Sequence, residues 1–131
     1  MLDDTIYIVV SIDKNFYHHL NVLINSIKFY NKSKIHLFLC ISTFKDKEFF
    51  SSNLSTFNSL SFSFEIILFQ KHDFLDIFAG KKYDHPIECY FRILFGSLLP
   101  QRIQKIIYLD ADMIVNCDLF ELYNTNIATT I

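Results

Sequence analysis

The stretch Lys105–Val115, K-I-I-Y-L-D-A-D-M-I-V, determines how the rest of the chain is interpreted. Four apolar residues, 106–109, run directly into Asp110 and Asp112, which a single alanine separates. A short apolar run bounded in this way predicts a buried strand over Lys105–Asp110, and strands of a parallel sheet are apolar on both faces. Because an ionised carboxylate is costly to bury without a partner, we expect both aspartates at the exit of the strand.

Two carboxylates this close repel each other, and a bound divalent cation relieves the repulsion. Mg²⁺ and Mn²⁺ take oxygen ligands, commonly one or two carboxylates together with phosphate oxygens. The spacing of Asp110 and Asp112 therefore indicates a candidate metal site. Because spacings this short also recur by chance, a solvated acidic turn at the end of a strand is the alternative. The motif alone leaves both open.

The composition favours a single globular domain. The 131 residues are 51% hydrophobic, include 15 Phe and no Trp, and carry a formal net charge of −2. This is ample apolar material for one core, and the excess predicts some apolar surface that contacts a partner. We expect no nucleic-acid partner, because a chain without a basic field does not neutralise phosphates along a strand. No glycine-rich phosphate loop occurs in a sequence with two glycines.

The cysteines and the N-terminal residues indicate the cellular compartment of the protein. Cys40, Cys89 and Cys117 lie far apart and without zinc or redox spacing, which predicts buried thiols in a reducing compartment. Asp3 and Asp4 precede the first apolar run, so no basic signal-peptide region is apparent. No apolar stretch is long enough to cross a bilayer. These features predict a cytoplasmic protein.

Hydrophobic periodicity predicts alternating strands and helices. The expected strands are Ile6–Ile12, Ile35–Ile41, Phe62–Phe69 and Lys105–Asp110, followed by a short strand at Met113–Val115 and the start of another at Ile127–Ile131. The expected helices are one capped by Asn15 with apolar residues from Phe16 to Ile27, one over Lys45–Leu60, and one from Pro86 to just before Pro100, with helical turns at Phe74–Phe78 and Asp118–Tyr123. The order β-α-β-α-β-α-β predicts an α/β fold, a mostly parallel sheet with helices on both faces.

The expected strand order places candidate site residues together. If the order is 3-2-1-4, the first and fourth strands are neighbours at the topological switch point, where ligands bind outside the carboxyl ends of the strands. Asp13 and Asn15 follow the first strand, and Asp110 and Asp112 end the fourth. The fold therefore brings four polar residues from distant parts of the sequence to one crevice.

Three ordered motifs carry a resemblance to a known family. They are I-V-V-S-I-D-K-N-F at 8–16, Y-F-R-I-L-F at 90–95 and Y-L-D-A-D-M-I-V-N-C-D-L-F-E-L at 108–122. Together they resemble glycosyltransferase family 8, which includes lipopolysaccharide galactosyl- and glucosyltransferases and glycogenin. The resemblance implies the nucleotide-sugar-binding GT-A fold. It also implies transfer of a hexose from a UDP-sugar, with retention of configuration, to a glycan, lipopolysaccharide or lipid-linked oligosaccharide acceptor. For the full-length protein, the predicted cytoplasmic location includes a peripheral position at the inner face of the membrane.

The resemblance also implies roles for individual residues. The D-x-D motif, Asp110 to Asp112, matches the motif that binds Mn²⁺ (or Mg²⁺) bridging the donor diphosphate. Asp112 matches a direct metal ligand, and Asp110 matches a residue that contacts both metal and ribose. The remaining nucleotide-sugar contacts are Asp13 and Asn15 to uracil and ribose, Val10 and Ser11 through backbone groups, and Arg92 to the donor sugar or its phosphate.

The residues themselves leave alternatives for two of these roles. Arg92 lies four residues after Glu88, so a surface ion pair on one helix also explains it. Asp13 is also well placed to cap the first helix.

The sequence departs from the family pattern after Ile131. Family members are considerably longer, and their second half supplies a metal-binding histidine, the acceptor pocket and the residues near the reacting carbon. We therefore expect residues 1–131 to be the donor-binding part of a single GT-A domain, with no catalytic residue of its own and little transferase activity alone. An unpaired sheet edge and apolar surface predict self-association through the incomplete face.

Two other functions remain open from the sequence. One is a non-catalytic nucleotide-sugar-binding protein, or a subunit completed by another chain. The other is a haloacid-dehalogenase-like phosphohydrolase, whose nucleophile motif is also an apolar strand ending in D-x-D. That motif normally opens the domain and has Thr or Val where Ile114 stands here, which argues against the phosphohydrolase.

Overall fold

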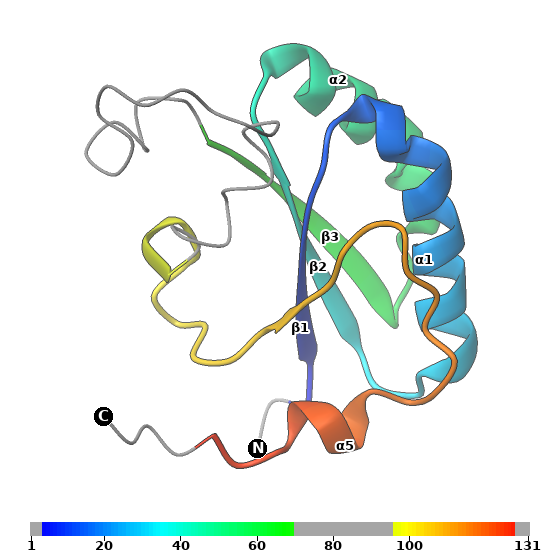
Figure 1. The fold of residues 1–131 in the computed structure, drawn as a ribbon, viewed down its shortest axis with the longest axis vertical. Helices are drawn as coiled ribbons and strands as arrows, with labels where there is room; N and C mark the ends of the chain where they lie inside the picture. Colours follow the sequence, from blue (N-terminus) through cyan, green and yellow to red (C-terminus); the bar gives the residue numbers. More distant parts are fainter. Residues whose placement is uncertain (1–3, 70–95, 128–131) are drawn as a thin grey trace.

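A computed structural model describes residues 4–69 and 96–127. Its centre is a parallel sheet of four strands in the order β3-β2-β1-β4 (Figure 1). The strands are β1 (Ile6–Ser11), β2 (Ile35–Ile41), β3 (Phe62–Leu68) and β4 (Ile107–Tyr108). The predicted α/β class and the predicted strand order are both confirmed.

Helices connect the strands and cover one face of the sheet. They are the 3-10 turn η1 (Lys14–Phe16), α1 (Tyr17–Tyr30), α2 (Phe44–Asn53), the 3-10 turn η2 (Ser55–Phe57) and α5 (Phe120–Tyr123). Both α1 and α2 begin at the carboxyl end of the sheet, at the top of Figure 1. The amino ends of two helices and the carboxyl ends of the strands therefore lie at the same edge.

The sheet is buried on both faces, as the apolar strands predict. Alternate residues of each strand point to opposite faces, and the two faces carry separate apolar clusters. The cluster under α1 and α2 includes Ile6, Ile8, Val10, Leu20, Leu23, Ile24, Ile27, Leu37, Leu39 and Phe50. The cluster on the other face includes Val9, Phe38, Cys40, Phe69 and Leu99. Burial of this kind contributes about 1.5–3 kcal/mol for each large aliphatic side chain.

The chain after β4 crosses the edge of the sheet to reach α1. The backbone N–H of Leu109 donates to Val9 O at 3.0 Å, which continues the β1–β4 pairing by one bond. The chain is then fixed to α1, because Val115 N donates to Ser26 Oγ at 2.9 Å and Leu119 N donates to Asn31 Oδ1 at 2.7 Å. This connection holds the D-x-D motif over the carboxyl ends of β1 and β4.

Several predicted boundaries are wrong. The strand expected over Lys105–Asp110 is reduced to the two residues of β4. Met113–Val115 is not a strand, since the N–H of Val115 is bonded to a side chain rather than to a neighbouring strand. The helix expected over Lys45–Leu60 ends at Asn53, where a serine-rich stretch of low helix propensity begins.

The cap of the first helical segment is also different from the prediction. Asp13, not Asn15, is the N-cap of η1, and its Oδ1 accepts a hydrogen bond of 2.8 Å from Asn15 N. The predicted thiol burial holds for Cys40, whereas Cys117 is exposed.

Some expectations concern residues outside those described. They are the helical turn Phe74–Phe78, Cys89, Arg92, the strand start at Ile127–Ile131 beyond its first residue, and most of the helix expected between Pro86 and Pro100, of which residues 96–98 are helical. Across 4–69 and 96–127, no helix has the length and apolarity needed to cross a membrane.

Candidate functional site

The carboxyl ends of β1 and β4 form the edge on which the candidate site is built. The two strands pair in parallel, with Ile8 opposite Ile107 and Val9 opposite Tyr108. Asp110 follows one residue after the last β1–β4 hydrogen bond, and Asp13 follows two residues after β1 ends. Residues almost a hundred positions apart in sequence thus reach one edge, because a crossover connection returns the chain to the neighbour of its first strand.

The D-x-D motif presents two exposed carboxylates on a fixed backbone. Ala111 is 6% exposed and belongs to the apolar cluster under α1, whereas Asp110 and Asp112 are both exposed. The buried alanine anchors the loop, and its two neighbours face solvent. Carboxylate oxygens are the ligands that Mg²⁺ and Mn²⁺ prefer, so the donor set fits such a cation.

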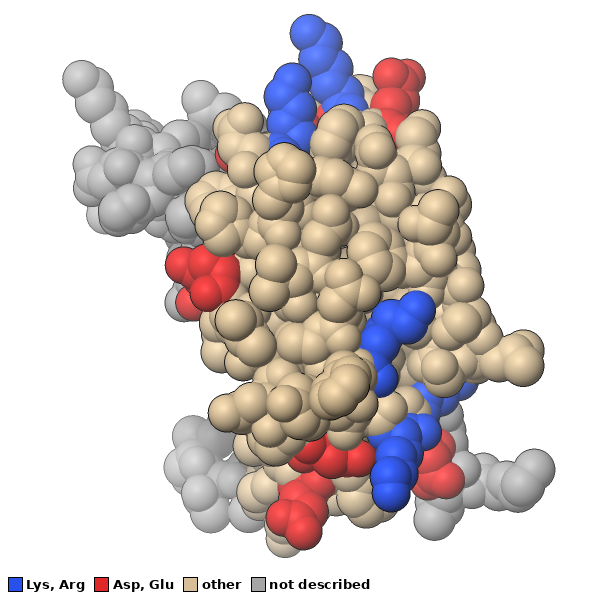
Figure 2. Space-filling view, turned by 90° about the vertical axis from the view of Figure 1, so that its right-hand side faces the viewer, with Lys and Arg blue, Asp and Glu red and all other residues tan. Residues whose placement is uncertain are grey.

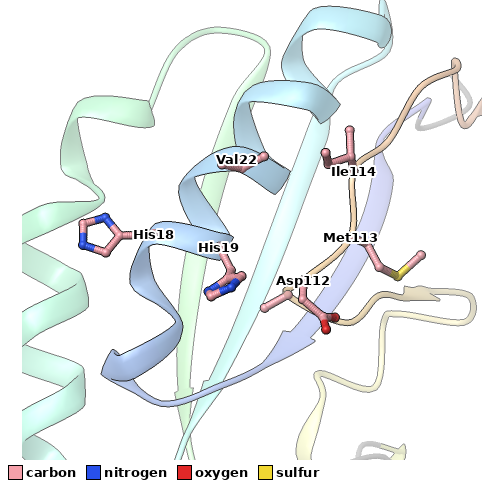
Figure 3. Close-up of a pocket in the computed structure, with 7 residues that line it drawn as sticks. His18, His19, Val22, Asp112, Met113 and Ile114 are labelled. Atoms are coloured by element: carbon pink, nitrogen blue, oxygen red, sulfur yellow. The ribbon is translucent and has the colours of Figure 1, made fainter.

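A cavity of about 310 Å³, which we term the helix–loop cavity, separates α1 from the loop after β4. Its lining residues are His18, His19, Val22, Ala111, Asp112, Met113 and Ile114. In Figure 3 His19 lies on the side of α1 that faces Asp112, whereas His18 points away from the loop. Among the described residues, no group of three or more His, Cys, Asp or Glu side chains forms a metal cluster, so neither histidine completes a three-residue site with Asp112.

A second cavity, of about 330 Å³, lies between the amino ends of η1 and α2. We term it the cap cavity, because both N-cap residues line it. Its lining residues are Asp13, Lys14 and Asn15 from one side and Thr43, Lys45 and Asp46 from the other. Thr43 caps α2, since its Oγ1 accepts a hydrogen bond of 3.1 Å from Asp46 N.

The expected site residues therefore share an edge but not a single cavity. Asp13 and Asn15 line the cap cavity, and Asp112 lines the helix–loop cavity. Val10 is fully buried, so its side chain belongs to the core and only its backbone is available to a ligand. Ser11 is partly exposed at the end of β1, and Arg92 lies outside the described residues.

Sequence reasoning missed the second wall of the cap cavity. The sequence pattern assigns Lys45 and Asp46 only to a helix, although they lie in the first turn after β2, which ends at Ile41. Applying the carboxyl-end rule to β2 as well as to β1 identifies Thr43–Asp46 as a candidate, because β2 is the other neighbour of β1.

Solved structures resemble this fold. An active-site mutant of LgtC superposes with a TM-score of 0.68 at 23% identity, covering 92% of this chain and 42% of LgtC. A complex of the galactosyltransferase LgtC with donor and acceptor sugar analogues gives a TM-score of 0.67 at 22% identity, covering 92% and 43% of the two chains. Mouse xyloside xylosyltransferase 1 gives 0.64 at 14% identity, covering 91% and 47%. No curated protein sequence matches the chain.

These likenesses define the fold as the GT-A type of the glycosyltransferases. The model of glycosyl transferase family 8 matches residues 7–131, and the chain belongs to that family. The resemblance drawn from the three motifs is confirmed, and the haloacid-dehalogenase-like alternative is excluded. The chain spans less than half the length of the LgtC and xylosyltransferase structures it matches.

Proposed function

We propose that this chain binds the donor of a metal-dependent, retaining hexosyltransferase that uses a UDP-sugar. The observation that carries the proposal is the parallel pairing of β1 with β4, which brings Asp13 and the D-x-D motif to one edge of a glycosyltransferase fold. The galactosyltransferase LgtC, one of the similar structures, was solved with donor and acceptor sugar analogues. A glycan or lipopolysaccharide acceptor is part of the same proposal.

Asp110 and Asp112 hold the divalent cation, Mn²⁺ or Mg²⁺, in this proposal. Both carboxylates are exposed, and the buried Ala111 between them fixes the backbone from which they project. A cation held by Asp110 and Asp112 would offset the negative charge that develops on the departing diphosphate. Two protein carboxylates complemented by phosphate oxygens are an ordinary coordination for such a cation, so donor and cation are expected to bind together.

The other contacts surround the nucleoside. Asp13 and Asn15 lie beside the uracil and ribose, and Val10 and Ser11 contribute backbone groups at the end of β1. Arg92 approaches the phosphate or the sugar. Residues that act on the acceptor and at the reacting carbon, and a third protein ligand to the metal, come from the part of the fold that the longer relatives contain beyond the matched length. Cytoplasmic location stays a prediction.

The test is calorimetric titration of UDP into the 131-residue chain with and without Mn²⁺. We expect Mn²⁺ to tighten UDP binding in the wild type, and Asp112→Ala to abolish that gain. Glu121→Gln is a matched control, because it removes an exposed carboxylate from α5, nine residues after the motif, without changing the motif itself. UDP binding that does not respond to Mn²⁺ in the wild type contradicts the proposal.

A donor-binding chain without transferase activity is the second candidate for the 131 residues. The sequence spans 42% of the LgtC mutant structure. A UDP-hexose transfer assay distinguishes the two, since robust transfer or hydrolysis by the 131-residue chain contradicts the non-catalytic candidate.

We also propose that the chain associates with itself through an exposed apolar face. The face formed by α1 and the loop after β4 carries few charged side chains, as Figure 2 shows. Val22, Phe29 and Ile114 are exposed there, Phe29 to 81%. Light scattering at high concentration is the check, and a clean monomer contradicts self-association.

A further inference from the structure

The outer edge of β3 is unpaired among residues 4–69 and 96–127. β3 is the first strand in the sheet order β3-β2-β1-β4, and in this part of the chain it pairs with β2 alone (Figure 1). A strand at the edge of a sheet presents a row of backbone N–H and C=O groups with which another strand can pair. We term this outer side of Phe62–Leu68 the β3 edge.

The hydrogen bonds between β2 and β3 show which residues of β3 face outward. Ile35 N donates to Ser61 O at 2.9 Å, and Phe69 N donates to Ile41 O at 2.9 Å, one bond at each end of the pairing. The backbone groups of successive strand residues point to opposite sides of the strand. The odd-numbered residues of β3 therefore face β2, and the even-numbered residues face outward.

Three outward-facing residues have unused backbone groups. Phe62 O already accepts a hydrogen bond of 2.9 Å from Ser59 N. In the part of the chain that the structure describes, no hydrogen bond reaches the backbone N–H and C=O groups of Phe64, Ile66 and Leu68. These three residues offer donors and acceptors to a strand that lies alongside them.

The β3 edge lacks the features that usually block a sheet edge. Natural edge strands are commonly protected by lysine, by proline or by a bulge. Residues 62–68 read F-S-F-E-I-I-L, with neither lysine nor proline and with Glu65 as the single charge. The β2–β3 register runs through all seven residues of β3 without a bulge. The side chains of Phe64, Ile66 and Leu68 are half-buried and pack against the cluster under α1 and α2.

The sequence of the β3 edge is complementary to itself. In an antiparallel pair of two copies centred on Ile66, the two Ile66 residues lie opposite each other, and Phe64 lies opposite Leu68. All three outward-facing residues then form hydrogen-bonded pairs, and apolar side chains meet apolar side chains on one face. Glu65 lies opposite Ile67, so the two glutamates do not face each other. A register centred on Glu65 opposes like charges, which destabilises a strand pair.

We propose that the β3 edge binds the β3 edge of a second copy of this chain, antiparallel, about a two-fold axis at Ile66. A two-fold axis uses the same surface on both copies, and here it joins two four-stranded sheets into one. A single pair of seven-residue strands is smaller than a standard interface, so the dimer depends on concentration. This inference goes beyond donor binding and concerns a surface other than the apolar face of α1.

Hydrogen exchange of backbone amides, followed by NMR in dilute and concentrated solutions of the 131-residue chain, tests the pairing. Exchange at Phe64, Ile66 and Leu68 should slow with concentration, by about tenfold once about nine-tenths of the chains are paired. The amides of Ser63 and Glu65 face β2 and should exchange slowly at both concentrations. Light scattering reports the oligomeric state in parallel. A chain that stays monomeric, or a dimer in which exchange at Phe64, Ile66 and Leu68 is unchanged, overturns the inference.

Ile66→Pro removes the central donor of the proposed pair. The N–H of Ile66 faces away from β2, so the change breaks no hydrogen bond of the sheet, and proline is tolerated on edge strands in this orientation. Dimerisation should weaken by about tenfold or more, because two hydrogen bonds are lost at the two-fold axis. Phe29→Ala, at an 81% exposed position of α1, is the control and should leave the dimer intact. Loss of the dimer in Phe29→Ala alone assigns association to the α1 face and contradicts the β3 edge.

A cross-linking variant tests the register even if Ile66→Pro folds poorly. The two-fold axis places the Cα atoms of the two Ile66 residues about 5.5 Å apart, within the range that a disulfide spans. Ile66→Cys, in a Cys117→Ser background, should form a bridge between the two copies of residue 66 on mild oxidation, identified by peptide mapping. Leu60→Cys, at a fully exposed position before β3, is the matched control. Equal cross-linking of the two variants contradicts the axis at Ile66. UDP binding with Mn²⁺ is unaffected by either result, so the proposed function stands or falls separately.

Discussion

The Oγ of Ser26, on α1, accepts a hydrogen bond of 2.9 Å from the backbone N–H of Val115. The same hydroxyl donates to Leu23 O at 2.7 Å, so it bridges the helix and the loop that carries the D-x-D motif. Residues 89 positions apart in sequence are joined in this way. The position of Asp112 at the carboxyl edge of the sheet therefore depends on Ser26, which is not one of the proposed metal or nucleotide ligands.

Replacing Ser26 by alanine should weaken both the fold and the metal site. The change leaves the partly buried N–H of Val115 without its acceptor, which costs about 1–3 kcal/mol of unfolding free energy. We also expect weaker Mn²⁺-dependent binding of UDP, since the loop is no longer fixed to α1. Urea denaturation and calorimetric titration measure the two effects. Ser51→Ala, at an exposed position of α2, is the control, and equal behaviour of the two variants contradicts the bridging role.

Cysteine reactivity should separate the two described thiols. Cys40 is fully buried in the sheet, and this burial raises the pKa of its thiol far above the ordinary value, which disfavours the reactive thiolate. Cys117 is exposed. Alkylation of the native chain at mildly alkaline pH, followed by peptide mass mapping, should label Cys117 and leave Cys40 unlabelled until denaturant is added. Rapid native labelling of Cys40 argues against its burial in the core around β2.

The stability of the chain should fall as the pH falls through the ordinary range of histidine. Burial lowers the pKa of His36 below 6.5, Arg102 and Lys34 lower it further, and Glu65 opposes them. The unfolded chain therefore takes up a proton at a pH where the folded chain does not, so stability is full above about pH 6.5 and is lost below it. Nδ1 of His36 lies 2.7 Å from Ser63 Oγ. Nε2 is buried 3.9 Å from Glu65 Oε1 and has no hydrogen-bond partner among residues 4–69 and 96–127.

His36→Gln should reduce this pH dependence. Denaturation midpoints from about pH 7.5 to about pH 5 are the measurement, and the variant should show the flatter profile. His19→Gln, at an exposed histidine of α1, is the matched control and should keep the wild-type profile. A profile that His36→Gln leaves unchanged contradicts the linkage.

The strands of the sheet were predictable because their runs of apolar residues match their buried positions in the fold. The β2 strand was predicted at Ile35–Ile41 and has those bounds. The strand order 3-2-1-4 was an assumption typical of such sheets, and the structure has it; this order places Asp13 and Asp110 at the same edge. The class of the candidate site could therefore be inferred before its geometry was known.

The loop after the D-x-D motif and the cap cavity were not predictable in the same way. Met113–Val115 is apolar like a strand, but Val115 finds its hydrogen-bond acceptor on Ser26, a tertiary contact that no local pattern reveals. Asp46 looks like an ordinary charge on an amphipathic helix. Its burial depends on how α2 sits against η1 at the end of the sheet, so only the structure distinguishes it from the exposed Glu48.

The most direct test of the donor site is paramagnetic broadening of backbone amide NMR signals by Mn²⁺ in the presence of UDP. We predict the strongest broadening at residues 110–112, with clear broadening at Asp13 and Asn15. Signals at the amino ends of the strands, such as those of Ile35 and Phe62, lie about 20 Å away along a seven-residue strand and should broaden least. Broadening centred at that opposite edge, or spread evenly over the chain, contradicts the assignment of the D-x-D motif as the metal site.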